Sequence, residues 1–390
     1  MPDFSMTETT LDAPVLATRL AATLAANPAL PESAKQLSAY RGVLTPSRLD
    51  APERETAALL SGAAAHDLGW LRRTAVRGED RFRWLSGMVT NTVNDLGRDA
   101  DAWNLVLNAQ GRIQGDLTVS RDGDALELVI AADQQEKLLA HFDRFIIMDD
   151  VELIALSEET ALGLIGPQSA DVLTRLGLPA PAAPMTALRT AWNGFDMRIH
   201  RAYGVLAPHY ELWVDAPAIP VLWKALHAAG AASVGTAVLE AFRVAEGIPA
   251  YGIDIAERDL PQETSQLRAL HFSKGCYLGQ EIVERIHSRG NVHRHLRLLE
   301  LAGPIPETGA TLTLAGSGDG EKSAAGNVTS AAEFFNGSEA RIFALGMISA
   351  AAELRNQPLT YAVGEQTGIA RILAAPVVDA IETPIGNQEL

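Results

Sequence analysis

The sequence predicts an α+β fold divided into more than one lobe, with an all-β unit at its C-terminal end. The chain has 390 residues, which is more than one ordinary hydrophobic core holds, so two or three lobes are expected. Between about residues 160 and 240, helix and strand patterns alternate in an order typical of a ferredoxin-like lobe. After residue 290, short apolar segments bounded by turn residues favour a small β-barrel or sandwich.

The first part of the chain predicts short helices mixed with strands. Residues 1 to about 50 carry an amphipathic helical pattern at 15–24 and no functional signal. Phe82, Leu85 and Met88 recur at helical spacing and predict a helix over 79–88. A turn at 108–111 separates two strand patterns, 103–107 and 113–119, which predicts a hairpin. Further strands are expected at 71–76 and 125–130, and a further helix at 134–145.

The second part predicts the ferredoxin-like lobe and the barrel. Pro167 is a favourable helix start before the helix predicted at 169–176, and Gly247 suits the C-cap of the helix predicted at 236–246. A glycine-rich stretch at 316–320 predicts a hairpin loop, because no helix with dinucleotide-binding spacing follows it. The other expected elements are strands at 162–165, 195–200, 211–214, 296–301, 311–314, 324–329, 341–348 and 359–362, and a helix at 220–229.

The composition indicates a globular protein with 47% hydrophobic and 21% charged residues. The sequence holds no continuous apolar run long enough for a membrane helix and no N-terminal pattern of a secretory signal, so a cytoplasmic location is expected. The net charge of −16 argues against a general nucleic-acid binder, which needs basic surface against phosphates. The stretch 274–297 is locally basic, which predicts either attraction of a small anion or a solvated face.

Cys276 is the single cysteine of the chain. A helix is predicted over 277–286, and Lys274 and Gly275 precede the sulfur. A helix N-terminus and a nearby lysine both favour the thiolate, so Cys276 is a candidate nucleophile or redox thiol. The alternative is a small buried hydrophobe.

A metal site is a further interpretation of the residues around Cys276. His293 and His295 would share one face of a strand, and with His287 and Cys276 they offer ligands for zinc or iron. The spacing matches no closed zinc motif, so no metal is expected.

Several blocks of the sequence resemble one known family. The run from Lys274 to Glu281, KGCYLGQE, closely resembles the signature of the YgfZ family, the folate-binding relatives of the glycine-cleavage T-protein that support iron–sulfur enzymes. In the same order along the chain, further similar blocks lie at 78–91, 107–113, 165–167, 210–211 and 243–254. The resemblance covers the chain from about residue 50 onward.

The resemblance implies three lobes around a hole that holds tetrahydrofolate or a derivative. It divides the chain into an N-terminal extension (1–50), a folate-binding region of two interleaved α+β lobes (51–290, the second at about 160–240) and a C-terminal β-barrel (291–390). Glu211 resembles the carboxylate that recognises the pterin, since one carboxylate accepts two adjacent N–H groups. Arg243 would meet the glutamyl carboxylates or a ring oxygen. Without the resemblance, Glu211 would be a solvent-facing strand residue and Arg243 part of a surface ion pair. The implied cofactor-binding residues are Glu211, Arg243, Trp103, Asn108 and Asp116.

One departure from the family bears on catalysis. True aminomethyltransferases carry paired aspartates after the hairpin, and here the aligned pair is Gly115 and Asp116. Glycine accepts no proton, which disfavours the ordinary aminomethyltransferase reaction. Whether Asp116 is structural or a weak substitute is left open by the sequence.

The expected function is therefore tetrahydrofolate binding in support of iron–sulfur cluster assembly or repair. Cys276 would be the functional thiol, facing the outer end of the folate, with Lys274 tuning it. The expected partners are iron–sulfur client enzymes or assembly factors, with no nucleic acid and no membrane. Two alternatives remain, a folate-dependent one-carbon transferase or demethylase and a non-catalytic scaffold regulated by folate. The residues expected to shape the loop are Gly275, Gly279 and Gln280, with Tyr277 and Glu281 positioning or packing it.

Overall fold

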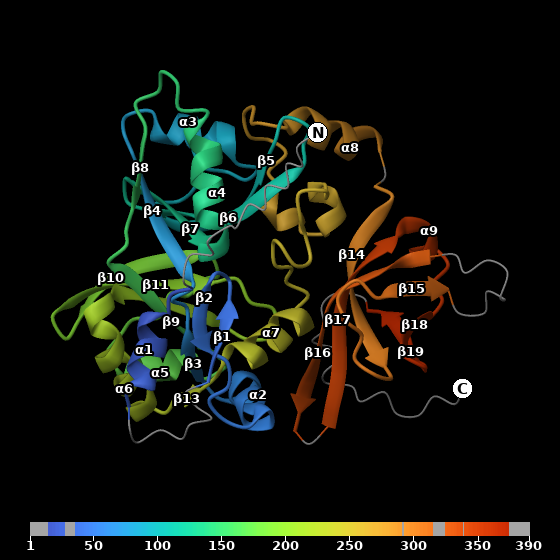
Figure 1. Ribbon diagram of the computed structural model, residues 1–390. Coiled ribbons are helices and arrows are strands. Elements are labelled where there is room, and N and C mark those ends of the chain that lie inside the picture. The colour runs from blue at the N-terminus through green and yellow to red at the C-terminus, as the bar shows by residue number, and fades with distance from the viewer. Residues whose placement is uncertain (1–14, 28–35, 291, 315–323, 338, 374–390) are drawn as a thin grey trace, which may run out of the picture.

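The computed structural model describes residues 15–27, 36–290, 292–314, 324–337 and 339–373. Figure 1 shows two α+β lobes that share one sheet and a β-barrel beside them. The sheet has eleven strands in the order β13-β3-β9-β12-β11-β10-β5-β6-β7-β4-β8. The two halves of this sheet join where β10 pairs with β5 through Thr186 and Ala100.

The first lobe is built on the β5-to-β8 half of the sheet and is stabilised by an apolar core under its helices. Leu138 and Phe142 of α4 are fully buried, and they pack with Leu117 and Val119 of β6. Its elements are β4 (Leu71–Arg77), α3 (Arg81–Met88), β5 (Asp99–Leu107), β6 (Ile113–Asp122), β7 (Ala125–Ala131), α4 (Ala132–Asp143) and β8 (Glu152–Ala155).

The second lobe has the predicted ferredoxin-like order of strands and helices. β9, α5, β11, β12, α6 and β13 follow the βαββαβ sequence, with β10 as an additional strand between α5 and β11. β3 is inserted between β13 and β9 in the sheet. The bounds are β3 (Ala64–Asp67), β9 (Glu159–Ile165), α5 (Ser169–Arg175), β10 (Thr186–Trp192), β11 (Phe195–Ala202), β12 (His209–Asp215), α6 (Ile219–Ala228) and β13 (Ala232–Ser233).

The N-terminal residues are part of this lobe. α1 packs against α6 and β2, and the β1–β2 hairpin pairs Leu37 with Pro46 through to Tyr40 with Val43. The elements are α1 (Arg19–Ala25), β1 (Leu37–Tyr40), β2 (Val43–Pro46) and α2 (Pro52–Ser61).

The C-terminal strands close into a six-stranded barrel, ordered β14-β17-β16-β15-β18-β19. α7 (Thr236–Ala245) lies against β16, and the rings of Phe242 and Phe334 meet at 6.1 Å. α7 therefore belongs to the interface between the lobes and the barrel. The remaining elements are η2 (Ala216–Ala218), η3 (Pro261–Thr264), η4 (Leu267–Ala269), α8 (Gln280–Arg289), β14 (Arg294–Ala302), β15 (Thr311–Leu314), β16 (Ala324–Asn336), β17 (Glu339–Ser349), α9 (Ala350–Glu353), β18 (Leu359–Val363) and β19 (Gln366–Ile372).

The structure differs from the sequence-based prediction at several elements. Several elements were not expected, most of them because short or mixed patterns carry little periodic signal. They are β1, β2, α2, β3, β8, β10, β13, α9 and β19. The helix predicted over 277–286 begins three residues later, at Gln280. The turn before it needs Gly279 at φ 82°, a conformation that favours glycine. The predicted loop at 316–320 lies outside the described residues. None of the described helices is long and apolar enough to cross a membrane.

Candidate functional site

A cavity of about 300 Å³ lies where the two halves of the sheet, α7 and the N-terminal hairpin converge. This volume is at the lower end of the range of small-molecule sites. β6 shows how the sequence produces one wall. Leu117 and Val119 are buried on one face, while Asp116 and Thr118 are half-buried on the other, and both line the cavity. The strand alternation thus places polar groups toward the cavity and apolar groups toward α4.

One row of residues across four strands forms the polar floor of the cavity. His66 on β3 is opposite Gly163 on β9, Gly163 is opposite Glu211 on β12, and Glu211 is opposite His200 on β11. Directly opposed residues project to the same face, so Glu211 stands between two histidines. Gly163 is required here, because a Cβ at this position would overlap the His66 ring.

Glu211 presents a carboxylate to this cavity, as the sequence predicted from the resemblance. Trp213 Nε1 donates to Oε2 at 2.9 Å, and within the described part of the chain no hydrogen bond reaches Oε1. Burial raises the pKa of Glu211, although the nearby His200 lowers it in part. The carboxylate therefore has capacity to accept further N–H groups from a ligand.

His200 and Asp101 form a buried pair beside Glu211. His200 Nδ1 lies 2.9 Å from Asp101 Oδ2, and each side chain is 4% exposed. Burial would raise the pKa of Asp101, but its contacts with His200, together with the charge of Arg73, outweigh burial and lower the pKa. Asp101 is thus held as a carboxylate that accepts the Nδ1 proton. Neither residue was predicted from the sequence, because their proximity depends on the β11–β12 register and on how the lobes dock.

Aromatic rings and a sandwiched arginine line the rest of the cavity. Trp70, Trp103 and Tyr203 all contribute to the lining. The guanidinium carbon of Arg268 lies 4.2 Å from the centre of the Trp103 ring and 4.0 Å from that of Tyr203. Burial lowers the pKa of Arg268 to about 10. Flat apolar rings beside polar groups suit a planar ligand with a polar edge.

Several polar atoms of the lining are buried and have no hydrogen-bond partner among the residues that the structure describes. An unpaired buried polar atom costs about 1–3 kcal/mol, so such atoms are rare in folded proteins. Five such atoms belong to residues that line this cavity, and a polar ligand bound there would pair with them. The atoms are His66 Nδ1, Trp70 Nε1, Asp101 Oδ1, His200 Nε2 and Glu246 Oε2.

Arg243 lines the cavity, but its donors are engaged within the protein. Nε and Nη2 contact Glu240, Nη1 donates to Asp254 and to the Ile248 carbonyl, and Nη2 donates to Ser330. These five contacts match the five N–H groups of a guanidinium. The ligand contact expected for Arg243 would have to replace one of them, so that role stays a prediction.

Arg41, on the N-terminal hairpin, also lines the cavity. Its Nη1 donates to the Tyr251 carbonyl at 2.7 Å, and its Nε lies 3.5 Å from Asp133. The neighbouring Tyr40 donates to Glu240 at 2.7 Å. The first fifty residues therefore supply part of the site. Nothing in their local pattern signalled this, because the hairpin reaches the cavity only through tertiary packing.

Asp116, not position 115, faces the cavity. A Cβ at Gly115 would meet Leu138 at 2.7 Å, on the side of α4. Asp116 accepts hydrogen bonds from Trp103 Nε1 at 3.1 Å and from Gln134 Nε2 at 2.8 Å. The strand pleat directs position 115 away from the cavity, so the missing side chain at Gly115 says less against aminomethyl transfer than the sequence suggested.

Asn108 is not among the residues that line the cavity. Its Oδ1 accepts from the backbone N–H groups of Gln110 and Arg112, both at 3.0 Å, and so shapes the hairpin turn. A Cβ at Gly279 would clash with the Asn108 carbonyl. Asn108 therefore supports the KGCYLGQE loop, and the cofactor contact expected for it has no geometric support here.

Lys274 anchors the KGCYLGQE loop to the first lobe. Its Nζ donates to the carbonyls of Val89 and Asn91, each at 2.7 Å, and burial lowers its pKa to about 8. Asn91 Nδ2 in turn donates to the carbonyls of Trp103 and Arg268, both of which line the cavity. The ammonium group therefore fixes the loop to the cavity wall through one intervening residue, Asn91.

Cys276 is exposed and is not part of the cavity lining. The helix that follows has Gly279 as its N-cap, so the thiol lies before the turn and not at the helix N-terminus. A Cβ at Gly275 would meet nothing within 4 Å, and the sharp turn expected there occurs at Gly279. From the sequence, the sulfur was expected to open onto the folate-binding cleft, but in the structure the thiol lies outside the cavity lining.

The other members of the motif have mainly local contacts. Tyr277 is buried, and its backbone N–H donates to Gln280 Oε1 at 3.3 Å. Glu281 is exposed in the first turn of α8. Tyr277 and Gln280 therefore brace the loop, while nothing in the structure assigns a contact to Glu281.

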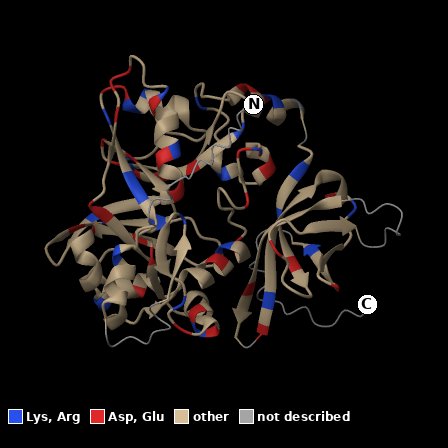
Figure 2. Ribbon diagram, in the orientation of Figure 1, with Lys and Arg blue, Asp and Glu red and all other residues tan. Residues whose placement is uncertain are grey.

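Basic and acidic residues are interspersed along the ribbon (Figure 2), and two arginines of the basic stretch at 274–297 are paired with carboxylates. Arg294 contacts Asp259 at 2.7 Å and Glu263 at 3.0 Å, and Arg297 contacts Glu353. The attraction of an anion predicted from the sequence is offset by these carboxylates. Two of the three histidines that the sequence offers as metal ligands also have partners within the described residues. His295 lies 2.8 Å from Glu353, and His287 stacks on Phe272 at 3.9 Å.

Comparisons with known proteins agree with this architecture. The model of the GCVT N-terminal domain matches residues 33–274. An aminomethyltransferase of Rubrobacter xylanophilus is 30% identical over 257 residues, covering 64% of this chain and 68% of the relative. The tRNA-modifying protein YgfZ of Escherichia coli is 25% identical over 242 residues, covering 61% of this chain and 72% of the relative.

A solved structure has the same fold. The glycine cleavage system aminomethyltransferase T of Bartonella henselae superimposes with a TM-score of 0.79 at 20% identity, over 89% of this chain and 95% of the other. The T-protein-like fold expected from the sequence is therefore confirmed, including its C-terminal β-barrel. On the extent of the domain match, this chain belongs to the GCVT family, whose relatives include aminomethyltransferases and YgfZ proteins.

Proposed function

We propose that the cavity binds tetrahydrofolate or a derivative. The observation that carries this proposal is the set of unpartnered buried polar atoms gathered around one cavity whose floor holds the Glu211 carboxylate. Family membership supports it.

The residues fit such a ligand at both of its ends. Glu211 would accept the adjacent N–H groups of the pterin edge, and Trp70 and Trp103 would contact the ring faces. At the other end, a carboxylate would meet Arg41 or Arg268. Within the described residues, Nη2 of Arg41 and both terminal nitrogens of Arg268 have no hydrogen-bond partner.

Titration of the purified protein with 5-formyl-tetrahydrofolate, a stable reduced folate, tests the proposal. We expect saturable quenching of tryptophan fluorescence with one site per chain, because Trp70 and Trp103 line the cavity. Calorimetry on the same samples checks the stoichiometry. A Trp103→Phe variant should lose much of the optical signal while calorimetry still detects binding. A dissociation constant of about 1 mM corresponds to weak binding. If the signal does not saturate up to about that ligand concentration, the folate assignment is rejected.

For the exposed thiol, we propose a role in supporting iron–sulfur client enzymes or their assembly factors. The motif resemblance motivates this role, and the firm anchoring of its loop through Lys274 supports it. An exposed thiol on a fixed loop is suited to meet a partner protein, whereas one inside the cavity would meet a small ligand.

Replacing Cys276 by Ala should lower iron–sulfur enzyme activity in cells that lack the wild-type protein, because no second cysteine can substitute. Folate affinity of the purified variant should stay within twofold, since the thiol is not in the cavity lining. Cys276→Ser is the matched control for side-chain size. Full rescue by the alanine variant would remove the thiol from the function.

A folate-dependent one-carbon transfer is the second candidate, and the position of Asp116 favours it. This carboxylate faces the cavity and is oriented by Trp103 and Gln134. It would hold or accept a proton at a bound ligand. Chemical change of methylene-tetrahydrofolate incubated with the protein and an amine distinguishes this candidate. Binding without turnover, together with full rescue by Cys276→Ala, would favour the folate-regulated scaffold.

A further inference from the structure

We propose that His200 Nε2, oriented by Asp101, accepts a hydrogen bond from a ring N–H of the ligand and so selects reduced over oxidised pterins. The inference rests on the proposed folate function and adds a specificity-determining residue to it. His200 would act beside Glu211, on the adjoining edge of the ring.

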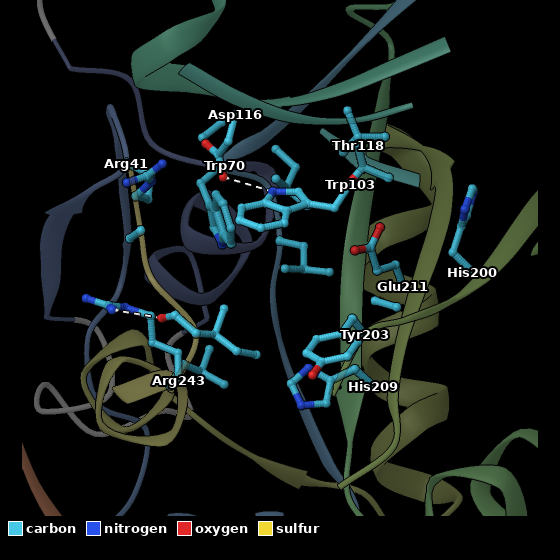
Figure 3. Close-up of a pocket in the computed structure, with 18 of the residues that line it drawn as sticks. Arg41, Trp70, Trp103, Asp116, Thr118, His200, Tyr203, His209, Glu211 and Arg243 are labelled. Carbon is cyan, nitrogen blue, oxygen red and sulfur yellow. Dashed lines mark hydrogen bonds between the residues drawn. The ribbon is translucent and has the colours of Figure 1, made fainter. Parts of the chain in front are cut away.

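The position of His200 is fixed by the sheet. It is directly opposite Glu211 in the β11–β12 pair, and such residues have Cβ atoms about 4.5–5.5 Å apart on the same face. His200 is 3% exposed and lines the cavity. Its Nε2 is buried and has no hydrogen-bond partner in the described part of the chain. In Figure 3, Glu211 lies between His200 on one side and Trp70 and Arg243 on the other. His200 is at one end of the labelled residues.

Asp101 determines which nitrogen of His200 is an acceptor. Its Oδ2 lies 2.9 Å from Nδ1, and its pKa is lowered, so it is a carboxylate. A carboxylate only accepts, so the Nδ1 nitrogen must carry the proton. In the neutral ring, Nε2 then has a lone pair and no hydrogen. The end of the cavity next to Glu211 is therefore built to receive a further N–H group.

The chemistry of pterins makes this hydrogen-bond acceptor selective for the reduced ring. The reduced ring carries a hydrogen on N8, on the edge next to the amino group that Glu211 would bind. In the fully oxidised ring of folic acid, N8 has a lone pair and no hydrogen. Two lone pairs would then face each other, and the buried Nε2 would stay unpaired. A site built to hydrogen-bond an N–H group strongly rejects the analogue that lacks it.

Comparison of 5-formyl-tetrahydrofolate with folic acid tests the inference. We expect the wild-type protein to bind the reduced ligand at least about tenfold more tightly. In Asp101→Asn, an amide N–H that donates to Nδ1 forces the proton onto Nε2, as the corresponding substitution does in serine proteases. The preference should then fall to about twofold or reverse. In His200→Leu, which removes the acceptor, it should fall likewise.

Asp196→Asn is the matched control, because Asp196 is exposed on the same strand as His200 and is not in the cavity lining. This variant should keep the wild-type preference. Unchanged preference in Asp101→Asn or in a folded His200→Leu would overturn the assignment of His200 while leaving folate binding intact. If the wild-type protein binds neither ligand, the proposed function fails, and this inference fails with it.

Discussion

Replacing Glu211 by Gln is expected to weaken the binding of 5-formyl-tetrahydrofolate by roughly 30- to 150-fold, or about 2–3 kcal/mol. The carboxylate would accept two N–H groups of the pterin edge, and the glutamine side chain keeps one acceptor and turns the other into a donor. One ligand N–H would then face an N–H of the protein. The measurement is calorimetric titration of both proteins with the same ligand stock.

The stability of the same variant separates a binding role from a structural one. Burial raises the pKa of Glu211, so the ionised side chain opposes folding at pH values above its folded-state pKa. Glu211→Gln should therefore be at least as stable as wild type at pH 8, which urea denaturation would check. The exposed Glu158→Gln is the control for the loss of one carboxylate. If Glu211→Gln keeps wild-type affinity, Glu211 does not recognise the ligand.

Replacing Arg243 by Met is expected to lower the free energy of unfolding by about 3–5 kcal/mol. The change removes the ion pair to Asp254, whose side chain is fully buried, and leaves that carboxylate without its charge partner. It also removes the hydrogen bond to Ser330 of β16, which joins α7 to the barrel. Both losses follow from the position of Arg243 between the lobes.

Urea denaturation of Arg243→Met measures this effect. Arg98→Met is the control, since its ion pair with Asp124 has both side chains largely exposed, at 67% and 72%, and such pairs contribute at most about 1 kcal/mol. If Arg243→Met is as stable as wild type but loses folate affinity, then Arg243 is a ligand contact, as the resemblance implied, and its internal contacts are dispensable.

Local patterns and the family resemblance each predicted part of the structure correctly. β6 and the helix α4 were expected because apolar residues recur with the period of each element, and tertiary packing agrees with that period. Glu211 and Asp116 were expected near a ligand through the resemblance, and both line the cavity. The helix after Cys276 was predicted three residues too early, since its apolar pattern extends into the turn that Gly279 makes.

The sequence by itself determined the fold class, because periodic apolar residues specify most of the longer strands and helices locally, whereas short strands such as β3 and β8 carry little signal. It also identified the KGCYLGQE run as a distinct feature. Only the tertiary structure decided which side chains meet. Strand register set His200 opposite Glu211, the strand pleat turned Asp116 and not position 115 toward the cavity, and the anchoring of Lys274 left Cys276 on the outside. These outcomes depend on pairings between residues far apart in the chain, and no local pattern encodes them.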